Sequence, residues 1–484
     1  EKHTMNDRKG FGSNFGFLMA AVGSAVGLGN IWGFPNKMGA NGGFPFLILY
    51  LALALCCGVI IMLGELALGR KTGHGAVGAY QSISKRFKWL GWLGIAAAAL
   101  IFSFYSALGG YCLRYVVVNF GNLIGAEFGT NGVGGADVFQ GLLSQPDVSI
   151  AFALAFMLIT MLVVMSGVGG GIERVCSVGM PALFFILIIC IIRSCTLPGA
   201  VDGLKYMFVP GWAVANGIID EAPGFWRVLT AAGGQMFFSL SLGAGVMITY
   251  GSYLDKKQDL GKSTMIIVGM DTVVALMAGL CVIPGRFALD PNGALGGPEL
   301  LFITMQNVFD KMGPAGPVFG ILFYLLVFFA AISSSISMLE VIVAHFCDKA
   351  REKGKGDRRK LYSAIAVVIC AALCALVCAD GMGSNHISPA ELLGLAGAKL
   401  PGWSTSWLGL FDSVAEGLLM PLGALLMCLM ISWELKPDVL RQEILLNGEN
   451  RPWVYDFFRL CVKYITPLCM LMILYGQISD FFIV

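Results

Sequence analysis

The sequence predicts an all-α membrane protein whose chain crosses the bilayer many times. Of its 484 residues 57% are hydrophobic and only 13% are charged. A soluble domain has about a quarter of its residues charged, so a chain with half that fraction leaves most of its surface to lipid. The apolar residues also gather in long uninterrupted stretches, and a spanning helix needs about 20 mainly apolar residues.

Eleven such stretches follow one another along the chain, and each predicts one transmembrane helix. They lie near residues 15–36, 45–69, 90–120, 149–165, 178–197, 227–251, 263–284, 315–346, 361–380, 407–433 and 457–483.

The lysine and arginine residues between these stretches predict the orientation of the chain. With the N-terminus inside, the inner segments contain 22 of them and the outer segments about five. Positive residues are retained on the cytoplasmic side, so we expect a cytoplasmic N-terminus and, after an odd number of crossings, an external C-terminus. No cleavable signal is apparent, and the expected location is the cell (inner or cytoplasmic) membrane.

The remaining composition excludes several classes of function. The 30 acidic and 32 basic residues nearly balance, which argues against nucleic-acid binding. Most of the 14 cysteines lie in or beside apolar stretches, where cysteine is usually a packing residue. The four histidines show no zinc-site spacing, and no nucleophile with a neighbouring base is evident. We therefore expect neither an enzyme nor an organic cofactor.

Two of the predicted helices contain clusters of glycine, at residues 23–30 and 238–245. Each glycine lowers helix propensity by about 1 kcal/mol, so such clusters favour unwinding within the membrane. Unwound backbone at that depth can bind an ion and an anionic group of a substrate. Glycines also allow close helix packing, which is the simpler explanation for one helix alone. Because the two clusters occupy matching positions in the two halves of the chain, a transport site is favoured.

Six motifs follow one another along almost the whole chain: 23–35 (GSAVGLGNIWGFP), 41–43 (NGG), 64–70 (GELALGR), 104–106 (FYS), 235–243 (QMFFSLSLG) and 328–335 (FFAAISSS). In these motifs the chain resembles the neurotransmitter:sodium symporter family, and within it the bacterial, leucine-transporter-like amino-acid transporters. The resemblance implies a single transporter domain over residues 1–484. It would contain two inverted five-helix repeats, 15–197 and 227–433, with discontinuous helices 1 and 6, and an extra helix at 457–483.

The resemblance also implies two sodium sites built from oxygen ligands, which a hard cation prefers. The first would use the substrate carboxylate with the Ala25 carbonyl, the Asn30 amide oxygen, Ser239 and Asp271. The second would use the carbonyls of Gly23, Val26 and Ala330 and the hydroxyls of Ser333 and Ser334.

Asp271 is an ionisable residue within an apolar stretch, which by itself suggests a functional site. Animal members of the family have an asparagine there and use chloride to balance the sodium charge, so we expect transport without chloride. Glu65 is expected to accept hydrogen bonds from backbone amides freed in the first helix.

The implied substrate pocket combines backbone groups of the broken helices with apolar side chains. Its residues are Ser24, Ala25, Leu28, Gly29, Ile101, Tyr105, Phe238, Ser239, Ser241, Ala244, Ser334 and Met338. Monoamine carriers have an aspartate where this chain has Ser24, so a zwitterionic amino acid is favoured, with a hydrophobic, aromatic or branched side chain. The alternatives are a proton-coupled amino-acid permease of the same fold and, from another class, an ion channel.

The gates match the family unevenly. On the cytoplasmic side Arg8, Phe11, Ser252, Tyr253 and Asp348 match the inner gate, which an arginine–aspartate pair closes. On the outer side Gly33 stands where the family has an arginine, although the expected partner, Asp412, is present. Either another donor replaces the arginine, or Tyr105 and Phe238 close the pathway. The protein is expected to be a monomer or a weak dimer.

Overall fold

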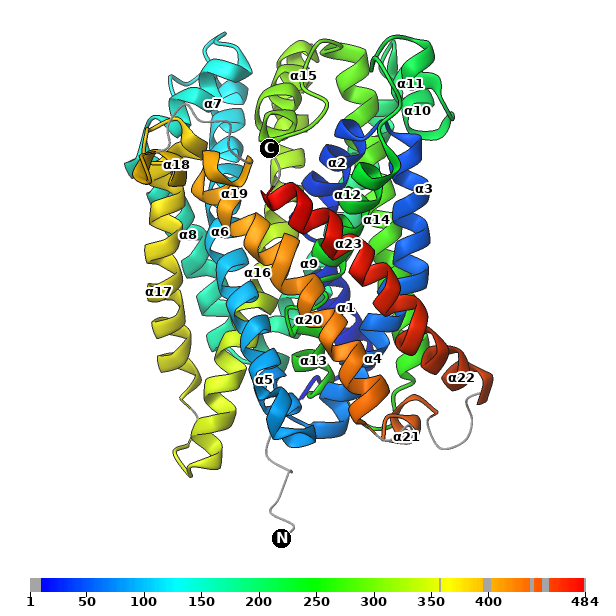
Figure 1. Ribbon diagram of the computed structural model, residues 1–484. Helices are drawn as coiled ribbons and strands as arrows, with labels where there is room; N and C mark the ends of the chain where they lie inside the picture. Colours follow the sequence, from blue (N-terminus) through cyan, green and yellow to red (C-terminus); the bar gives the residue numbers. More distant parts are fainter. Residues whose placement is uncertain (1–9, 357, 395–401, 436–438, 446–451, 483–484) are drawn as a thin grey trace.

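The computed structural model describes residues 10–356, 358–394, 402–435, 439–445 and 452–482. These residues form helices and connecting loops, with no β-strand in the ranges given (Figure 1). The long helices run between two ends of an upright bundle. We call the end at which the first helix starts the N-terminal end, and the other the opposite end.

The predicted spanning stretches are single or divided helices, and the labels with η in this series mark short π-type segments. In chain order they are α1 (Asn14–Ala25), η1 (Gly29–Gly33), α2 (Phe34–Ala40), α3 (Phe44–Leu53), η2 (Ala54–Gly58), α4 (Val59–Thr72), α6 (Lys88–Ile124), α8 (Pro146–Met165), η4 (Val168–Ile172), α9 (Glu173–Cys195), α12 (Phe225–Leu240), α13 (Val246–Gly251), α14 (Leu260–Leu289), α16 (Gly316–Glu352), α17 (Arg359–Asp380), α19 (Trp407–Asp412), η9 (Ser413–Leu419), α20 (Met420–Leu429), η10 (Met430–Glu434), η12 (Cys461–Ile465) and α23 (Thr466–Phe482).

Within the described ranges, nine continuous helices are long and apolar enough to cross a membrane, and the bent pair of α1 with η1–α2 makes a tenth. The remaining predicted stretch, 227–251, is divided into α12 and α13, of 16 and 6 residues. Each candidate span coincides with a predicted stretch, which confirms the all-α membrane fold. The total of eleven crossings stays a prediction.

Several helices are longer than their apolar stretches. The third extends over Lys88–Ile124 instead of 90–120, and the eighth over Gly316–Glu352 instead of 315–346. The fifth begins at Glu173 instead of residue 178. A hydropathy window detects only the part of a helix that lies in the hydrocarbon core, which is about 30 Å thick. A helix of 37 residues is about 55 Å long, so its ends extend beyond that core.

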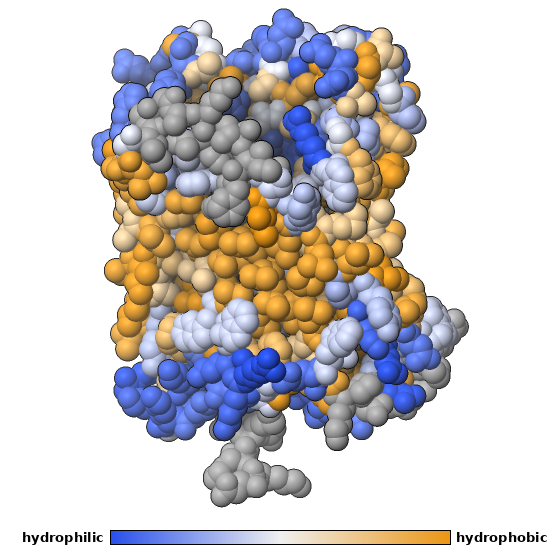
Figure 2. Space-filling model, in the orientation of Figure 1, coloured by the Kyte–Doolittle hydropathy of each residue, from blue (hydrophilic) through white to orange (hydrophobic). Residues whose placement is uncertain are grey.

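The surface matches this arrangement. On the face that Figure 2 shows, a broad hydrophobic band crosses the middle of the molecule, with hydrophilic residues at both ends. Large exposed side chains on the candidate spans include Leu158, Phe185 and Val368, which would contact lipid. A belt of this kind is expected of a helical bundle whose outer face is solvated by hydrocarbon.

The helical interruptions in the first and sixth helices are confirmed, but their backbone causes differ. In the first helix α1 ends at Ala25, Val26 is extended at ψ 95°, and the two halves are bent by 43°. In the sixth helix Ser241, Gly243 and Gly245 take the left-handed conformation, with φ of 54°, 78° and 74°. Glycine adopts that conformation without strain, so it explains the second break and not the first.

Short helices that the sequence analysis did not predict cover both ends of the bundle (Figure 1). At the opposite end they include α7 (Gly135–Leu143), α10 (Ala200–Phe208), α11 (Trp212–Ala215) and α15 (Met305–Lys311), and at the N-terminal end α5 (Ala76–Ile83) and α21 (Arg441–Ile444). The helix α22 (Pro452–Leu460) instead begins the last candidate span, Trp453–Ser479. The broken helices lie inside: α1 packs against α9, α14 and α16, and α13 packs against α4. This places both interruptions in the protein core.

Candidate functional site

The first interruption faces two serine side chains of α16. The hydroxyl of Ser333 donates hydrogen bonds to the carbonyls of Ala330 at 2.9 Å and Val26 at 3.4 Å. The hydroxyl of Ser334 donates to the carbonyl of Gly23 at 3.3 Å. All five predicted ligands of the second sodium site therefore lie in one buried, oxygen-lined group. Such a group suits a hard monovalent cation.

A second polar group surrounds Asp271 of α14, which is completely buried. Its carboxylate accepts hydrogen bonds from the Asn30 amide at 2.7 Å, from the Ser239 hydroxyl at 2.9 Å and from the Tyr50 hydroxyl at 3.2 Å. The ion pairs found among the described residues do not include Asp271. A buried carboxylate is costly without a compensating positive charge, so this position favours a cation.

The orientation of Asn30 differs from what a sodium ligand requires. Its amide nitrogen faces Asp271, whereas its amide oxygen accepts a hydrogen bond from the backbone amide of Gly27 at 3.1 Å. The side-chain amide must turn before its oxygen can face an ion beside Asp271. Ala25, the other predicted protein ligand on this helix, is the buried last residue of α1.

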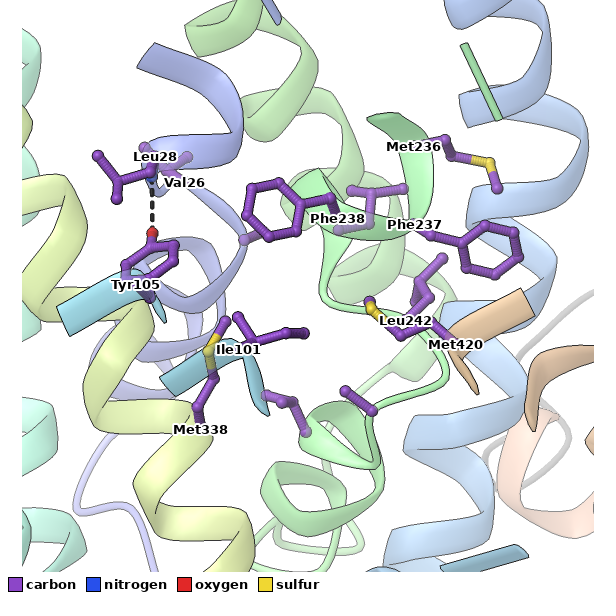
Figure 3. Close-up of a cluster of buried hydrophobic side chains, with 14 of the residues drawn as sticks. Val26, Leu28, Ile101, Tyr105, Met236, Phe237, Phe238, Leu242, Met338 and Met420 are labelled. Carbon is purple, nitrogen blue, oxygen red and sulfur yellow. Dashed lines mark hydrogen bonds between the residues drawn. The ribbon is translucent and has the colours of Figure 1, made fainter. Parts of the chain in front are cut away.

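A cluster of buried apolar side chains adjoins these groups, and Tyr105 of α6 connects it to the first break. The Tyr105 hydroxyl accepts a hydrogen bond from the backbone amide of Leu28 at 2.7 Å, drawn as a dashed line in Figure 3. Its ring lies 6.2 Å from the ring of Phe238. Figure 3 places Ile101 and Met338 below this aromatic pair. The cluster thus meets polar groups on its helix-break side and is apolar elsewhere.

Gly27 allows the close approach of these elements. A Cβ atom built on Gly27 would overlap both the Tyr105 hydroxyl and the Ser334 hydroxyl. Glycine is therefore required at this position because a larger side chain would not fit. Its backbone conformation does not require glycine, because its φ is not in the left-handed region.

The other predicted pocket residues divide between the two breaks. The Ser241 hydroxyl donates to the Ser24 carbonyl at 3.0 Å, and Ser24 in turn donates to Ser337 at 2.7 Å. Gly29 lies against Phe238, because a Cβ atom on Gly29 would be 3.0 Å from that ring. Ala244 is buried in the second break. The structure therefore brings the two interruptions into direct contact.

One expectation is wrong. Glu65 was expected to bind amides of the first helix, but its carboxylate accepts a hydrogen bond from the amide of Gly243, at 2.7 Å, in the sixth. The left-handed turn at Ser241–Gly245 directs its free amide toward α4, whereas the amide of Leu28 in the first break already has Tyr105 as its acceptor. A buried amide must be satisfied, so Glu65 stabilises the second interruption.

At the N-terminal end, aromatic contacts and a buried ion pair close the bundle. Phe11 packs on the rings of Tyr250 and Tyr253, with centroids 5.6 Å and 6.2 Å apart. The Tyr253 hydroxyl donates to Glu340, which also pairs with Arg359 at 3.0 Å. The sequence analysis named Phe11 and Tyr253 but missed Glu340 and Arg359.

The predicted Arg8–Asp348 pair is only half described, because Arg8 lies outside the described residues. Asp348 accepts a hydrogen bond from the amide of Gly75 at 3.0 Å and lies 3.8 Å from Arg351. It borders a hollow of about 740 Å³ at this end.

At the opposite end Asp412 is the last residue of α19, and it lies close to Glu416, one turn further along the same helical path. An ion pair beside these residues joins Glu416 to Lys37 of α2. The predicted closing residue Asp412 is thus beside the pair, but the cation is a lysine that the sequence analysis did not name.

A model of the sodium:neurotransmitter symporter family matches residues 8–131 and 136–482, which is nearly the whole chain. The chain belongs to this family. Relatives with similar length support the assignment. The chain is 36% identical to the uncharacterized sodium-dependent transporter YhdH of Bacillus subtilis, covering 96% of this chain and 97% of that protein. It is 30% identical to an uncharacterized sodium-dependent transporter of Methanocaldococcus jannaschii, covering 90% and 84%.

A solved structure shows that the family fold is shared. The crystal structure of MhsT in complex with L-phenylalanine superimposes with a TM-score of 0.82 at 33% identity, covering 97% of this chain and all of that one. The sodium:neurotransmitter symporter family and this fold are those of multi-pass membrane transporters, not of enzymes.

Within this family framework, the residues that the sequence analysis missed share one signal. Tyr50 contacts Asp271, Gln235 donates to the Gly29 carbonyl at 2.6 Å, and Glu340 is completely buried. All three are polar groups within apolar stretches, the pattern that had already singled out Asp271. Applied to every polar residue of those stretches, the same criterion would have found them.

Proposed function

We propose that the protein is a sodium-coupled symporter that imports a hydrophobic L-amino acid by alternating access. The observation that most supports this function is the meeting of two interrupted helices between an oxygen-lined group and a cluster of buried apolar side chains. Sodium dependence of the relatives and the L-phenylalanine bound to MhsT agree with it.

The carboxylate of the amino acid is proposed to bind at the first break. There the backbone amide of Leu28 and the hydroxyl of Tyr105 form a hydrogen bond of 2.7 Å. An incoming carboxylate can accept from both groups at once, because the phenol has its own proton to donate. The hydrophobic side chain then packs against Ile101, Phe238 and Met338, all of which are buried.

Two sodium ions are proposed to enter with the substrate. One is held beside Asp271 and the substrate carboxylate, and the other among the Gly23, Val26, Ala330, Ser333 and Ser334 oxygens. Because the carboxylate would be a ligand of the first ion, substrate and sodium stabilise each other's binding, which is the coupling. The negative charge of Asp271 makes chloride unnecessary.

The direction of transport follows from the proposed orientation in the cell (inner) membrane. The N-terminal end of the bundle, with Phe11, Tyr253 and the 740 Å³ hollow, is assigned to the cytoplasm. The opposite end is assigned to the outside. Closing one end while opening the other moves the ions and the amino acid across the bilayer.

The test is uptake of radiolabelled L-amino acids into proteoliposomes under an inward sodium gradient, with potassium as the control cation and gluconate in place of chloride. Sodium-driven accumulation of an apolar amino acid without chloride is expected. Accumulation driven only by a proton gradient would instead support the proton-coupled permease. Equal, unsaturable flux with every cation would support a channel.

A further inference from the structure

The outer gate of this chain must differ from the family pattern, because Gly33 has no side chain. A Cβ atom on Gly33 would lie 2.9 Å from the Oε1 atom of Gln235 and 3.6 Å from its Nε2 atom. Gln235 is itself held in place, since its Nε2 donates to the Gly29 carbonyl at 2.6 Å. Gln235 of α12 therefore fills the space in front of residue 33, and a cation cannot extend from there without displacing it.

A cation is nevertheless present one helical turn away. Lys37 follows Gly33 by four residues on the same helical path, so the two positions share a face. Its ammonium forms an ion pair with the Oε1 atom of Glu416 in η9. Glu416 follows Asp412 by four residues and shares a face with it in the same way.

The directions of the two helices explain why the displaced residues still meet. The first helix runs outward, so Lys37 starts one turn further out than residue 33. The tenth helix runs inward, so Glu416 starts one turn further in than Asp412 (Figure 1). Side chains on a helix lean toward its N-terminus, which directs Lys37 inward and Glu416 outward. The lean of each side chain therefore cancels the one-turn shift of its residue. The ion pair forms at a depth between residue 33 and Asp412, the two positions that the family uses.

The sixth helix passes directly against this pair. A Cβ atom on Gly234 would lie 2.8 Å from the Glu416 carboxylate and 3.6 Å from the Lys37 ammonium. The same position is 3.0 Å from the side-chain amide of Gln477 in α23. Gly234 precedes Phe238 by one turn on α12, so the pair lies one turn further out than the Tyr105–Phe238 aromatic pair.

Burial shows that the contact is not an ordinary surface ion pair. The side chain of Lys37 is 25% exposed and that of Glu416 only 8%. Asp412 lies next to Glu416, so one lysine faces two carboxylates. Removing Lys37 would leave both carboxylates without a cation, whereas removing Asp412 would leave the ion pair in place.

We propose that Lys37 and Glu416 form the extracellular gate of this transporter, with Gln235 occupying the space of the missing arginine. The proposal deepens the proposed function and rests on its assignment of inside and outside. Opening of the pathway to the outside then requires this one ion pair to break, together with the separation of Tyr105 from Phe238.

The test is hydrogen–deuterium exchange of the full-length protein in lipid nanodiscs, which requires no knowledge of the substrate. Lys37→Met and Glu416→Gln should each accelerate exchange in Phe34–Ala40 and Phe225–Leu240 by about tenfold, since a partly buried ion pair is lost. The charge-exchange double variant Lys37→Glu/Glu416→Lys should recover most of the protection. Failure of this test would leave sodium-driven uptake intact, and so separates the gate from the proposed function.

Two controls sharpen the result. Lys205→Met removes an ion pair with Asp202 that is 3.4 Å long and in which both side chains are about half exposed. This variant should change exchange in Phe34–Ala40 and Phe225–Leu240 by less than about twofold. Asp412→Asn should accelerate exchange less than Glu416→Gln does. The proposal is overturned if the two single variants exchange like the wild type, if the double variant is no better protected than either single variant, or if Asp412→Asn has the largest effect. Should a single variant fail to fold, the double variant and Asp412→Asn still decide between the two carboxylates.

Discussion

At the residue scale, Asp271 shows how a single charge can define a site. Three neutral donors, Asn30, Tyr50 and Ser239, surround its carboxylate in the protein core. Neutral donors stabilise a buried negative charge but do not balance it, so the position retains an affinity for cations. The sequence alone identified this residue, because an ionisable group within an apolar stretch is rarely structural.

Asp271→Asn should separate the charge of this residue from its hydrogen bonding. Asparagine keeps the size and the acceptor oxygen but removes the negative charge, so sodium-dependent uptake in chloride-free medium should fall at least about tenfold. Uptake into proteoliposomes with and without chloride measures this. Asp310→Asn, outside the site on α15, is the control. Unchanged uptake without chloride would refute the role of the charge.

Three consecutive serines on α16 offer a matched comparison. Ser333 and Ser334 face the first helix, whereas the Ser335 hydroxyl lies 2.8 Å from Thr160 of α8. Ser333→Ala and Ser334→Ala each remove one cation ligand, and should raise the sodium concentration for half-maximal uptake about tenfold. Ser335→Ala should change it by less than about twofold. Equal effects of all three would show that the serines act through packing.

At the scale of the helix, the two interruptions have different physical causes. The second uses left-handed glycines and a buried carboxylate, Glu65, that binds the Gly243 amide. The first has no left-handed residue at its glycines and depends on close contact of Gly27 with α6 and α16. Glycine clusters predicted both breaks, but composition could not distinguish a flexible backbone from a tight contact.

Gly27→Ala should therefore impair the site more than its small size suggests. The added methyl group would overlap the hydroxyls of Tyr105 and Ser334, and such overpacking costs about 1–3 kcal/mol. We expect uptake to fall at least about tenfold and the thermal unfolding temperature to decrease. Gly179→Ala, on α9 with open space around its Cβ position, is the control and should be neutral or stabilising. Normal uptake by Gly27→Ala would contradict the tight contact.

At the scale of the whole molecule, the sequence predicted the spans but not what covers them. Windows of about 20 apolar residues locate helices in lipid, since the bilayer itself imposes that length. The short helices α7, α10 and α15 at the opposite end have no such constraint and depend on tertiary packing. Contacts such as Lys37–Glu416, 379 residues apart, follow from how distant helices meet, which no local pattern contains.

The ion pair at the N-terminal end gives a prediction on the stability of the whole bundle. Glu340 is completely buried and Arg359 is 15% exposed, so removing either one takes the ion-pair partner away from the other. Glu340→Met and Arg359→Met should each lower the free energy of unfolding by about 3 kcal/mol, and the double variant by less than the sum. Thermal unfolding in detergent measures all three. Additive losses would show that the two side chains act independently.

The serine hydroxyls beside the first interruption have a consequence for the return of the unloaded carrier. Ser333 and Ser334 donate to the same carbonyls that are proposed to hold an ion. When the ion leaves, each hydroxyl can rotate and satisfy a carbonyl with its own proton, so no bare dipole is left in the middle of the bilayer. A cage of fixed carboxylates would instead remain charged after release. By neutralising itself, this site lowers the barrier to the resetting step, and turnover can continue without a counter-ion at that position.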